Sequence, residues 1–234
     1  MLISTDRSII PACDVDVGRF EEIVRATADI PQVGAYKIGA ALGLSVGLRP
    51  LVDIARRYTQ KPLIYDHQKA GTDIPETGRL FTQTVKDCGI DALIIFPLTG
   101  PASQTAWIQS AQDAKLPVIV GGHMTHERFL VSDGGYIDDA AVDRIYNTSA
   151  VHGVSDYVVP GNKPEVIKHL RALLLSRGVD PVFYAPGFIA QGGTISDAAR
   201  VAGTRWHAIV GRALYEAQDI RRTALALIKN LGSI

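Results

Sequence analysis

The sequence predicts an α/β protein, a closed (β/α)8 barrel of the TIM type. Short apolar runs rich in β-branched residues alternate with longer segments of helical periodicity, and this alternation occurs eight times. Nearly continuous apolar runs are typical of parallel strands that are buried on both faces. Eight strand and helix units favour a closed barrel over an open, doubly wound sheet. We therefore expect a single barrel domain over residues 1–234.

The expected elements follow one another without a domain boundary or a low-complexity segment. The strands are Ile9–Asp14, Ala35–Gly39, Pro62–Asp66, Asp91–Phe96, Pro117–Gly121, Asp156–Val159, Val182–Ala185 and Trp206–Gly211. The helices are Arg19–Ala28, Leu48–Tyr58, Glu76–Cys88, Ala102–Ala114, Ala140–Val151, Pro164–Ser176, Ile195–Ala202 and Asp219–Leu231. Pro101 and Pro164 mark helix starts and Gly178 a helix end. The one long connection, His123–Asp139, has the length of a lid.

The composition excludes several classes of function. The 24 Lys and Arg residues balance 24 Asp and Glu residues, so no basic excess predicts a nucleic-acid or membrane surface. Cys13 and Cys88 are too few for a disulfide framework and lack metal-ligand spacing. No signal-like leader and no apolar run of about 18 residues is present. We expect a soluble cytoplasmic protein.

Charged residues gather where the strands of the barrel end. A (β/α)8 barrel carries its active site at the carboxyl ends of the strands. There the sequence places Asp14, Lys37 and Asp66 on the first three strands, with Lys69 and Asp73 just beyond. Lys37 interrupts an apolar strand and needs a partner charge, for which Asp14 and Asp66 are the obvious candidates. Any one of these could be a solvated rim residue, but the alternating set indicates a site.

A phosphate site is predicted at the last two strands. Barrels often bind phosphate with the loops after strands seven and eight. These loops carry Pro186, the run Gln191–Gly192–Gly193, and Gly211 followed by Arg212. Glycines let backbone N–H groups approach an anion, and an arginine adds a bidentate charged contact. The pattern indicates a phosphorylated ligand.

These residues resemble the orotidine 5'-monophosphate decarboxylase family, in order, over nearly the whole chain. Asp14 and Lys37 take the places of the family's acid on strand one and lysine on strand two. The matching elements are Asp73–Thr77, Met124–His126, Ala185–Gly187, Ala190–Gly193 and Val210–Arg212. The resemblance implies decarboxylation of orotidine 5'-monophosphate to UMP in de novo pyrimidine synthesis, with no metal and no organic cofactor.

The resemblance also implies a role for each site residue. Lys69 would stabilise the carbanion at C6 of the pyrimidine and then protonate it, with Asp66 beside the substrate carboxylate. Lys37 and Asp14 would hold this pair and meet the ribose. Thr125 would contact the pyrimidine, and Pro186, Gly211, Arg212 and the Gln191–Gly193 loop would hold the phosphate. Asp73 and Thr77 would reach the neighbouring subunit's site in a homodimer.

The spacing around Lys69 departs from the family. The usual signature is Asp-x-Lys-x-x-Asp, whereas Asp66 to Asp73 has one extra residue in each gap. Residues i and i+3 of an extended strand do not face the same side. We expect a bulge, or a turn eased by Gly71, to bring Asp66 and Lys69 together.

Two other functions fit parts of the sequence. One is a metal-dependent sugar-phosphate enzyme with the same barrel, a keto-gulonate 6-phosphate decarboxylase or hexulose-phosphate synthase. In those enzymes Ala-Gly usually follows the acid that corresponds to Asp73, whereas this chain has Ile74–Pro75 there. The other is a barrel that binds nucleotide phosphates without catalysis. His67, His123 and His126 lie near the predicted opening, but their spacing fits no strong metal motif.

Overall fold

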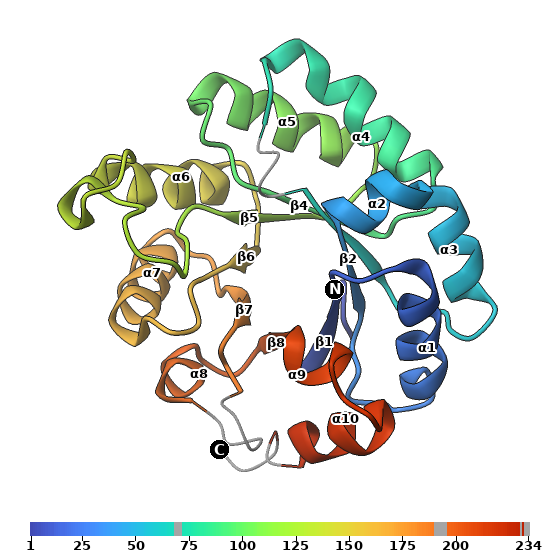
Figure 1. Ribbon diagram of the computed structural model, residues 1–234. Helices are drawn as coiled ribbons and strands as arrows, with labels where there is room; N and C mark the ends of the chain where they lie inside the picture. The colour runs from blue at the N-terminus through green and yellow to red at the C-terminus, as the bar shows by residue number, and fades with distance from the viewer. Residues whose placement is uncertain (68–71, 190–195, 230, 232–234) are drawn as a thin grey trace.

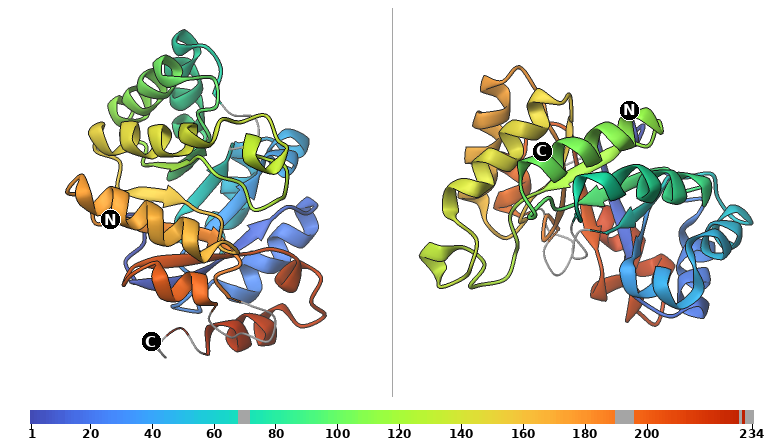
Figure 2. Two further views of the ribbon diagram at one scale, coloured as in Figure 1. Left: turned by 90° about the vertical axis from the view of Figure 1, so that its left-hand side faces the viewer. Right: turned by 90° about the horizontal axis from the view of Figure 1, so that it is seen from above.

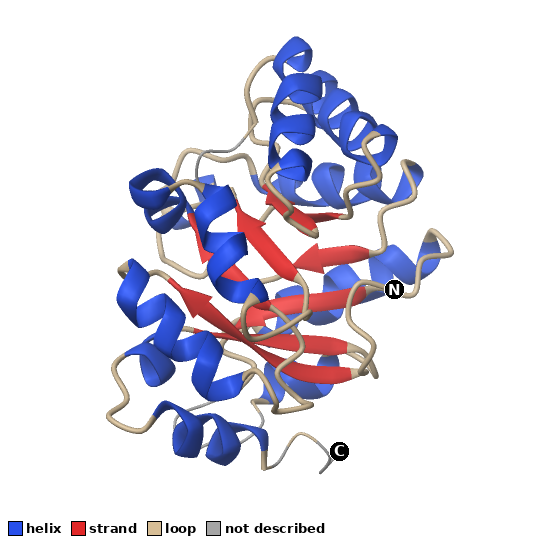
Figure 3. Cartoon of the chain, turned by 90° about the vertical axis from the view of Figure 1, so that its right-hand side faces the viewer, coloured by secondary structure: helices blue, strands red, loops and turns tan. Residues whose placement is uncertain are grey.

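The computed structural model describes residues 1–67, 72–189, 196–229 and 231. Its eight strands form a closed parallel barrel in sequence order, in which β1 pairs with β2 on one side and with β8 on the other. The helices form an outer ring around the strands (Figures 1 and 3). The predicted (β/α)8 fold is confirmed.

All eight strands occur where the sequence predicts them, with ends that differ by a few residues. Their bounds are β1 Arg7–Cys13, β2 Tyr36–Gly39, β3 Leu63–Asp66, β4 Ala92–Ile95, β5 Val118–Gly121, β6 Asp156–Val158, β7 Val182–Pro186 and β8 Trp206–Val210. Asp14, Phe96 and Gly211, expected as last residues of strands, each lie one position beyond. They belong to the loops at the carboxyl ends.

The helices also follow the predicted order. Their bounds are α1 Val17–Thr27, α2 Ala40–Val46, α3 Leu48–Arg56, α4 Gly78–Asp87, α5 Pro101–Asp113, α6 Asp139–Val151, α7 Pro164–Ser176, α8 Asp197–Val201, α9 Arg212–Tyr215 and α10 Ile220–Ile228, with short 3₁₀ helices η1 Pro75–Thr77 and η2 Val131–Asp133. The sequence pattern did not predict α2 or α9. Within the part of the chain that is described, no helix combines the length and apolar character needed to cross a membrane.

Local chemistry explains several helix ends. The side chain of Asp16 accepts a hydrogen bond from the backbone N–H of Arg19, and Ser196 caps α8 in the same way. Pro101 and Pro164 occupy the first turns of α5 and α7, where a missing N–H costs nothing. Gly178 ends α7 with a φ of 76°, as predicted from its place after the helix.

Two apolar clusters hold the barrel together. Alternate residues of the strands face opposite sides, so Ile9 packs outward against the helices and Ile10 packs inside the barrel. The outer cluster includes Phe20 of α1 and Trp107 of α5. The inner one is built mainly from strand residues and reaches the carboxyl ends of the strands at Phe96 and Val158. The long segment 122–138 stands out from that end of the molecule (Figure 2).

His207 is a buried titratable group at the opposite, amino end of the barrel. It is 2% exposed, its Nδ1 lies 2.8 Å from Oγ of Ser8, and its ring packs against Tyr184. Burial, with a smaller contribution from the charge of Arg205, lowers the pKa of His207 from 6.5 to about 3. The folded protein therefore keeps this imidazole neutral where the unfolded chain would protonate it.

We expect His207 to make the protein less stable in acid. As the pH falls from 6.5 to about 3, the unfolded chain binds a proton that the folded chain does not, so the free energy of unfolding falls. The full effect of this one group is about 5 kcal/mol. Urea unfolding of the wild type and of His207→Asn, whose amide can still meet Ser8, measures it. The wild type should lose stability relative to the variant as the pH falls, and parallel curves would refute the assignment.

Candidate active site

A cavity of about 310 Å³ opens at the carboxyl ends of the strands. This volume is at the lower end of small-molecule sites, about 300–1,000 Å³. Residues on or just after all eight strands line the cavity, among them Asp14, Lys37, Asp66, Phe96, His123, Val158, Pro186 and Ile209. The cavity therefore lies where barrel enzymes bind their substrates.

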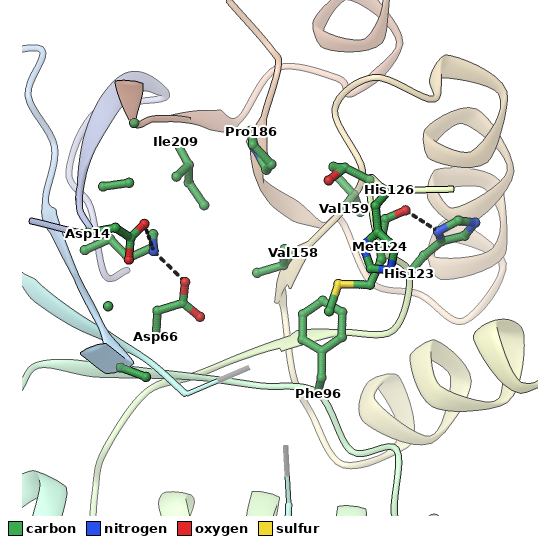
Figure 4. A pocket seen from close by; sticks show the side chains of 16 residues that line it. Asp14, Asp66, Phe96, His123, Met124, His126, Val158, Val159, Pro186 and Ile209 are labelled. Carbon is green, nitrogen blue, oxygen red and sulfur yellow. Dashed lines mark hydrogen bonds and ion pairs between the residues drawn. The ribbon is translucent and has the colours of Figure 1, made fainter. Parts of the chain in front are cut away.

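A buried ion pair lies at one side of this cavity. Nζ of Lys37 donates to Oδ2 of Asp66 at 2.6 Å and lies 3.5 Å from Oδ2 of Asp14. The side chains of Lys37 and Asp66 are only 6% and 7% exposed, whereas that of Asp14 is 52% exposed. Figure 4 shows the two carboxylates with the ammonium between them. The prediction that the acids at the ends of the first and third strands are the partners of Lys37 is confirmed.

The two acids keep Lys37 protonated. Burial alone would lower the pKa of its ammonium, because a low-dielectric environment disfavours the charged form. The charges of Asp66 and Asp14, with the hydrogen bond to Asp66, outweigh that effect and raise the pKa of Lys37 above its usual value. Lys37 is thus a fixed cation in the cavity wall at neutral pH.

Two glycines make room for this arrangement. A Cβ on Gly39, directly after Ile38 in β2, would lie 1.9 Å from Oδ1 of Asp14, so a larger residue there would displace that carboxylate from its position beside Lys37. A Cβ on Gly121 would lie 2.0 Å from the ring of Phe96, which is 1% exposed. Gly121 therefore allows an aromatic ring to form part of the apolar wall.

The opposite wall is formed by the segment after β5. Met124 and His126 lie across the cavity from Asp14 and Asp66, with Val158 between the two sides (Figure 4). His123 is buried, its Nδ1 lies 2.9 Å from the carbonyl oxygen of Met124, and burial lowers its pKa. His123 is therefore a neutral imidazole near neutral pH.

Six of the residues predicted for the site line the cavity, namely Asp14, Lys37, Asp66, Thr125, Pro186 and Gly211. Asp73, Thr77 and Arg212 are not among the residues that line it. Asp73 and Arg212 are exposed. Asp73 accepts from the backbone N–H of Ile74, and the hydroxyl of Thr77 donates to the Ile74 carbonyl, because both residues form the turn that begins η1.

Lys69, Gln191, Gly192 and Gly193 lie outside the described residues, and so does the predicted convergence of Lys69 with Asp66. The strand before Lys69 is regular. Asp66 is in register with Gly39 and Ile94, and the N–H of His67 still donates to the Ile94 carbonyl at 3.1 Å. Pairing with both neighbouring strands is therefore regular at Asp66, and with β4 it continues to His67.

The sequence pattern did not assign Phe96 or Ile209 to the site, although both line the cavity, and it placed His126 near the opening without giving it a role. Phe96 and Ile209 sit at the carboxyl ends of β4 and β8, and that position was the available signal. Because both are apolar, they resemble core residues in the sequence. Among the residues that the structure describes, no three His, Cys, Asp or Glu side chains are grouped so as to hold a metal ion.

Together, the fold and the cavity define a (β/α)8-barrel enzyme whose substrate site contains a buried lysine between carboxylates. Comparison with known proteins identifies which such enzyme family this is. The chain belongs to the orotidine 5'-phosphate decarboxylase / HUMPS family, whose model matches residues 9–227.

Individual relatives give the same result. The orotidine 5'-phosphate decarboxylase of Methanosarcina barkeri is 33% identical over 211 residues, which cover 90% of this chain and 89% of that protein. That of Methanosarcina mazei is 31% identical over 218 residues, 93% and 92% of the two chains. A solved structure, the orotidine 5'-monophosphate decarboxylase of Methanocaldococcus jannaschii complexed with the inhibitor BMP, superposes with a TM-score of 0.81. The two sequences are 25% identical, and the match covers 97% of this chain and 100% of that one.

Proposed function

We propose that this chain decarboxylates orotidine 5'-phosphate to UMP in cytoplasmic pyrimidine synthesis, without a metal or organic cofactor. The observation that carries the proposal is the Lys37 ammonium held between Asp66 and Asp14 in the cavity wall of a barrel of this family. All three relatives described above are named for this reaction, and none is named for a sugar-phosphate enzyme.

The reaction demands a cation beside one carbon atom. When the bond from C6 to the carboxyl group breaks, CO2 leaves and the electron pair stays on C6, where no neighbouring group can delocalise it. We assign Lys69 to this position on the resemblance of its motif. Its ammonium would stabilise the developing charge, transfer a proton to C6, and regain one from solvent. Preorganised charges of this kind often contribute more to catalysis than any other single effect.

The magnitude of such a charge is sufficient to matter. Two unit charges about 4 Å apart interact by roughly 4 kcal/mol at an effective dielectric constant near 20. Applied to the transition state alone, this corresponds to about three decades of rate. A carboxylate at Asp66 would add to it by disfavouring the substrate carboxylate until CO2 leaves, although such ground-state effects are the smaller part of our proposal.

The role of Lys37 follows from its contacts. With its Nζ 2.6 Å from Asp66, it compensates the charge of a carboxylate that is 7% exposed and fixes its direction. The remaining polar contact, with Asp14 at 3.5 Å, joins the pair to a half-exposed carboxylate. We propose that Lys37 positions Asp66, and that Lys37 and Asp14 meet the ribose hydroxyls.

The other predicted residues would hold the two ends of the nucleotide. Thr125, on the wall opposite Asp66, would contact the pyrimidine. Pro186 and Gly211 line the cavity at β7 and β8, where we place the phosphate. Arg212 and the loop Gln191–Gly193 would hold that phosphate, and this remote binding energy would then be used at the reacting carbon.

We further propose a homodimer in which Asp73 and Thr77 complete the partner's site. Neither residue lines the cavity of its own chain. Near them in the sequence, Ile74 is 57% exposed and Leu80 is 76% exposed, together with the exposed charged residues Glu76 and Arg79. Exposed apolar side chains with charged residues around them are compatible with a protein interface.

The activity is tested by incubating the purified protein with orotidine 5'-phosphate and following the ultraviolet spectrum. We expect conversion to UMP at the same rate with and without EDTA, because the proposed chemistry uses no metal. Loss of activity in EDTA that added divalent metal restores would favour the metal-dependent sugar-phosphate branch. No spectral change at high enzyme concentration would show a nucleotide binder without catalytic function.

A further inference from the structure

Arg19, in the first turn of α1, links two segments that are far apart in the sequence. Its Nε donates to the carbonyl oxygen of Tyr215 at 2.9 Å, and its Nη2 donates to that of Ala217. Its Nη1 pairs with Glu22 at 2.7 Å. The side chain is 25% exposed. One guanidinium therefore holds two backbone carbonyls at the end of α9.

The segment that Arg19 holds is the one that begins at the phosphate end of the cavity. Gly211 lines the cavity, and α9 starts at the next residue, Arg212. A helix of four residues is not stable in isolation, because helix formation is cooperative. The last carbonyl groups of such a helix also lack hydrogen-bond partners within it. Leu214, which is 1% exposed, anchors α9 in the core, and Arg19 supplies hydrogen-bond donors beyond its last turn.

Arg19 is itself fixed to the loop that follows the first strand. Its backbone N–H donates to Asp16, the cap of α1, and Asp14 lies two residues earlier. Strands β1 and β8 are neighbours where the barrel closes. Arg19 therefore connects the loop that carries Asp14 to the loop that carries Gly211 and Arg212.

We propose that Arg19 is a positioning residue for the phosphate end of the substrate. It holds the segment from Gly211 to Ala217 at a set distance from the β1 loop, so that Arg212 is already in place when the nucleotide binds. The planar guanidinium suits this role because its donors are fixed relative to one another. This inference rests on the proposed function, since it concerns the phosphate of the same ligand.

The test compares the binding of UMP and uridine, which share the ring and ribose but differ in the phosphate. In Arg19→Met, which keeps the aliphatic chain and removes the donors, UMP affinity measured by calorimetry should fall about tenfold while uridine affinity stays the same, because only phosphate binding is lost. Arg19→Lys can reach one carbonyl but not hold both, so its UMP affinity should lie between those of the wild type and Arg19→Met. Arg19→Lys also serves as the test if the methionine variant does not fold.

Arg221 offers a matched control. It joins α10 to the end of α1 through the Ala26 carbonyl and through Asp29 just beyond that helix, at 2.6 and 2.9 Å, and none of these hydrogen bonds involves α9. Arg221→Met should leave both affinities unchanged. Equal weakening of UMP and uridine in Arg19→Met, or no weakening of either, would overturn the proposal. If the wild type converts orotidine 5'-phosphate in either of those cases, only this inference fails; if it does not, the proposed function itself fails.

Discussion

Lys69→Ala is expected to abolish turnover of orotidine 5'-phosphate and to leave UMP binding measurable. The ammonium of Lys69 is proposed to act on the charge that forms at C6, and UMP carries no carboxyl group there. Removing a charge worth roughly 4 kcal/mol in the transition state lowers kcat by at least about three decades, and removing the proton donor lowers it further. The measurements are kcat by ultraviolet absorbance and UMP affinity by calorimetry.

The control for this variant is Lys168→Ala, which removes an exposed lysine from α7, away from the cavity. It should retain both turnover and UMP affinity. A kcat for Lys69→Ala near that of the wild type would remove Lys69 from its role, and the proton donor would then have to be sought elsewhere.

Lys37→Met is expected to reduce both stability and activity. The substitution deprives Asp66 of a cation 2.6 Å away, and Asp66 is only 7% exposed. Removing one member of a buried ion pair costs up to about 3–5 kcal/mol, because the carboxylate loses its hydrogen bond to the Lys37 ammonium. Urea unfolding should show this loss, and kcat should fall because Asp66 is no longer held in place.

Two further variants separate the effects on stability from those on catalysis. Asp14→Asn removes only the 3.5 Å contact with a half-exposed carboxylate, so the free energy of unfolding should change by less than about 1 kcal/mol. The double variant Lys37→Met, Asp66→Leu removes both buried charges and should regain most of the stability without regaining activity. If Lys37→Met is as stable and as active as the wild type, the buried pair has no role in either.

Most of the barrel could be predicted because its signals are local and repeated. Each strand is a short apolar run, and alternation with helical segments fixes the parallel order. The missed helix α2, Ala40–Val46, contains Gly43 and no charged residue, so no polar face reveals its period. The missed α9 is a single turn, held by the burial of its own Leu214 and by Arg19 of α1, and tertiary contacts of this kind are not visible in a local pattern.

The candidate site could be predicted where a charged residue interrupts an apolar strand. Lys37 in an apolar strand required partners, and the ends of the neighbouring strands supplied Asp14 and Asp66. Phe96 could not be recognised, because an apolar residue in the cavity wall looks like one in the core, and its space depends on Gly121 of the next strand. Asp73 and Thr77 follow β3 in sequence but turn away into η1, which sequence order alone does not reveal.

The most direct test of the central claim is a crystal structure of the protein with a bound nucleotide analogue. We expect the pyrimidine to occupy the cavity beside Asp66, with Nζ of Lys69 about 3 Å from the group at C6. The phosphate should lie at Gly211 and Arg212. A structure in which Lys69 points into bulk water, with no other cation beside C6, would contradict the mechanism.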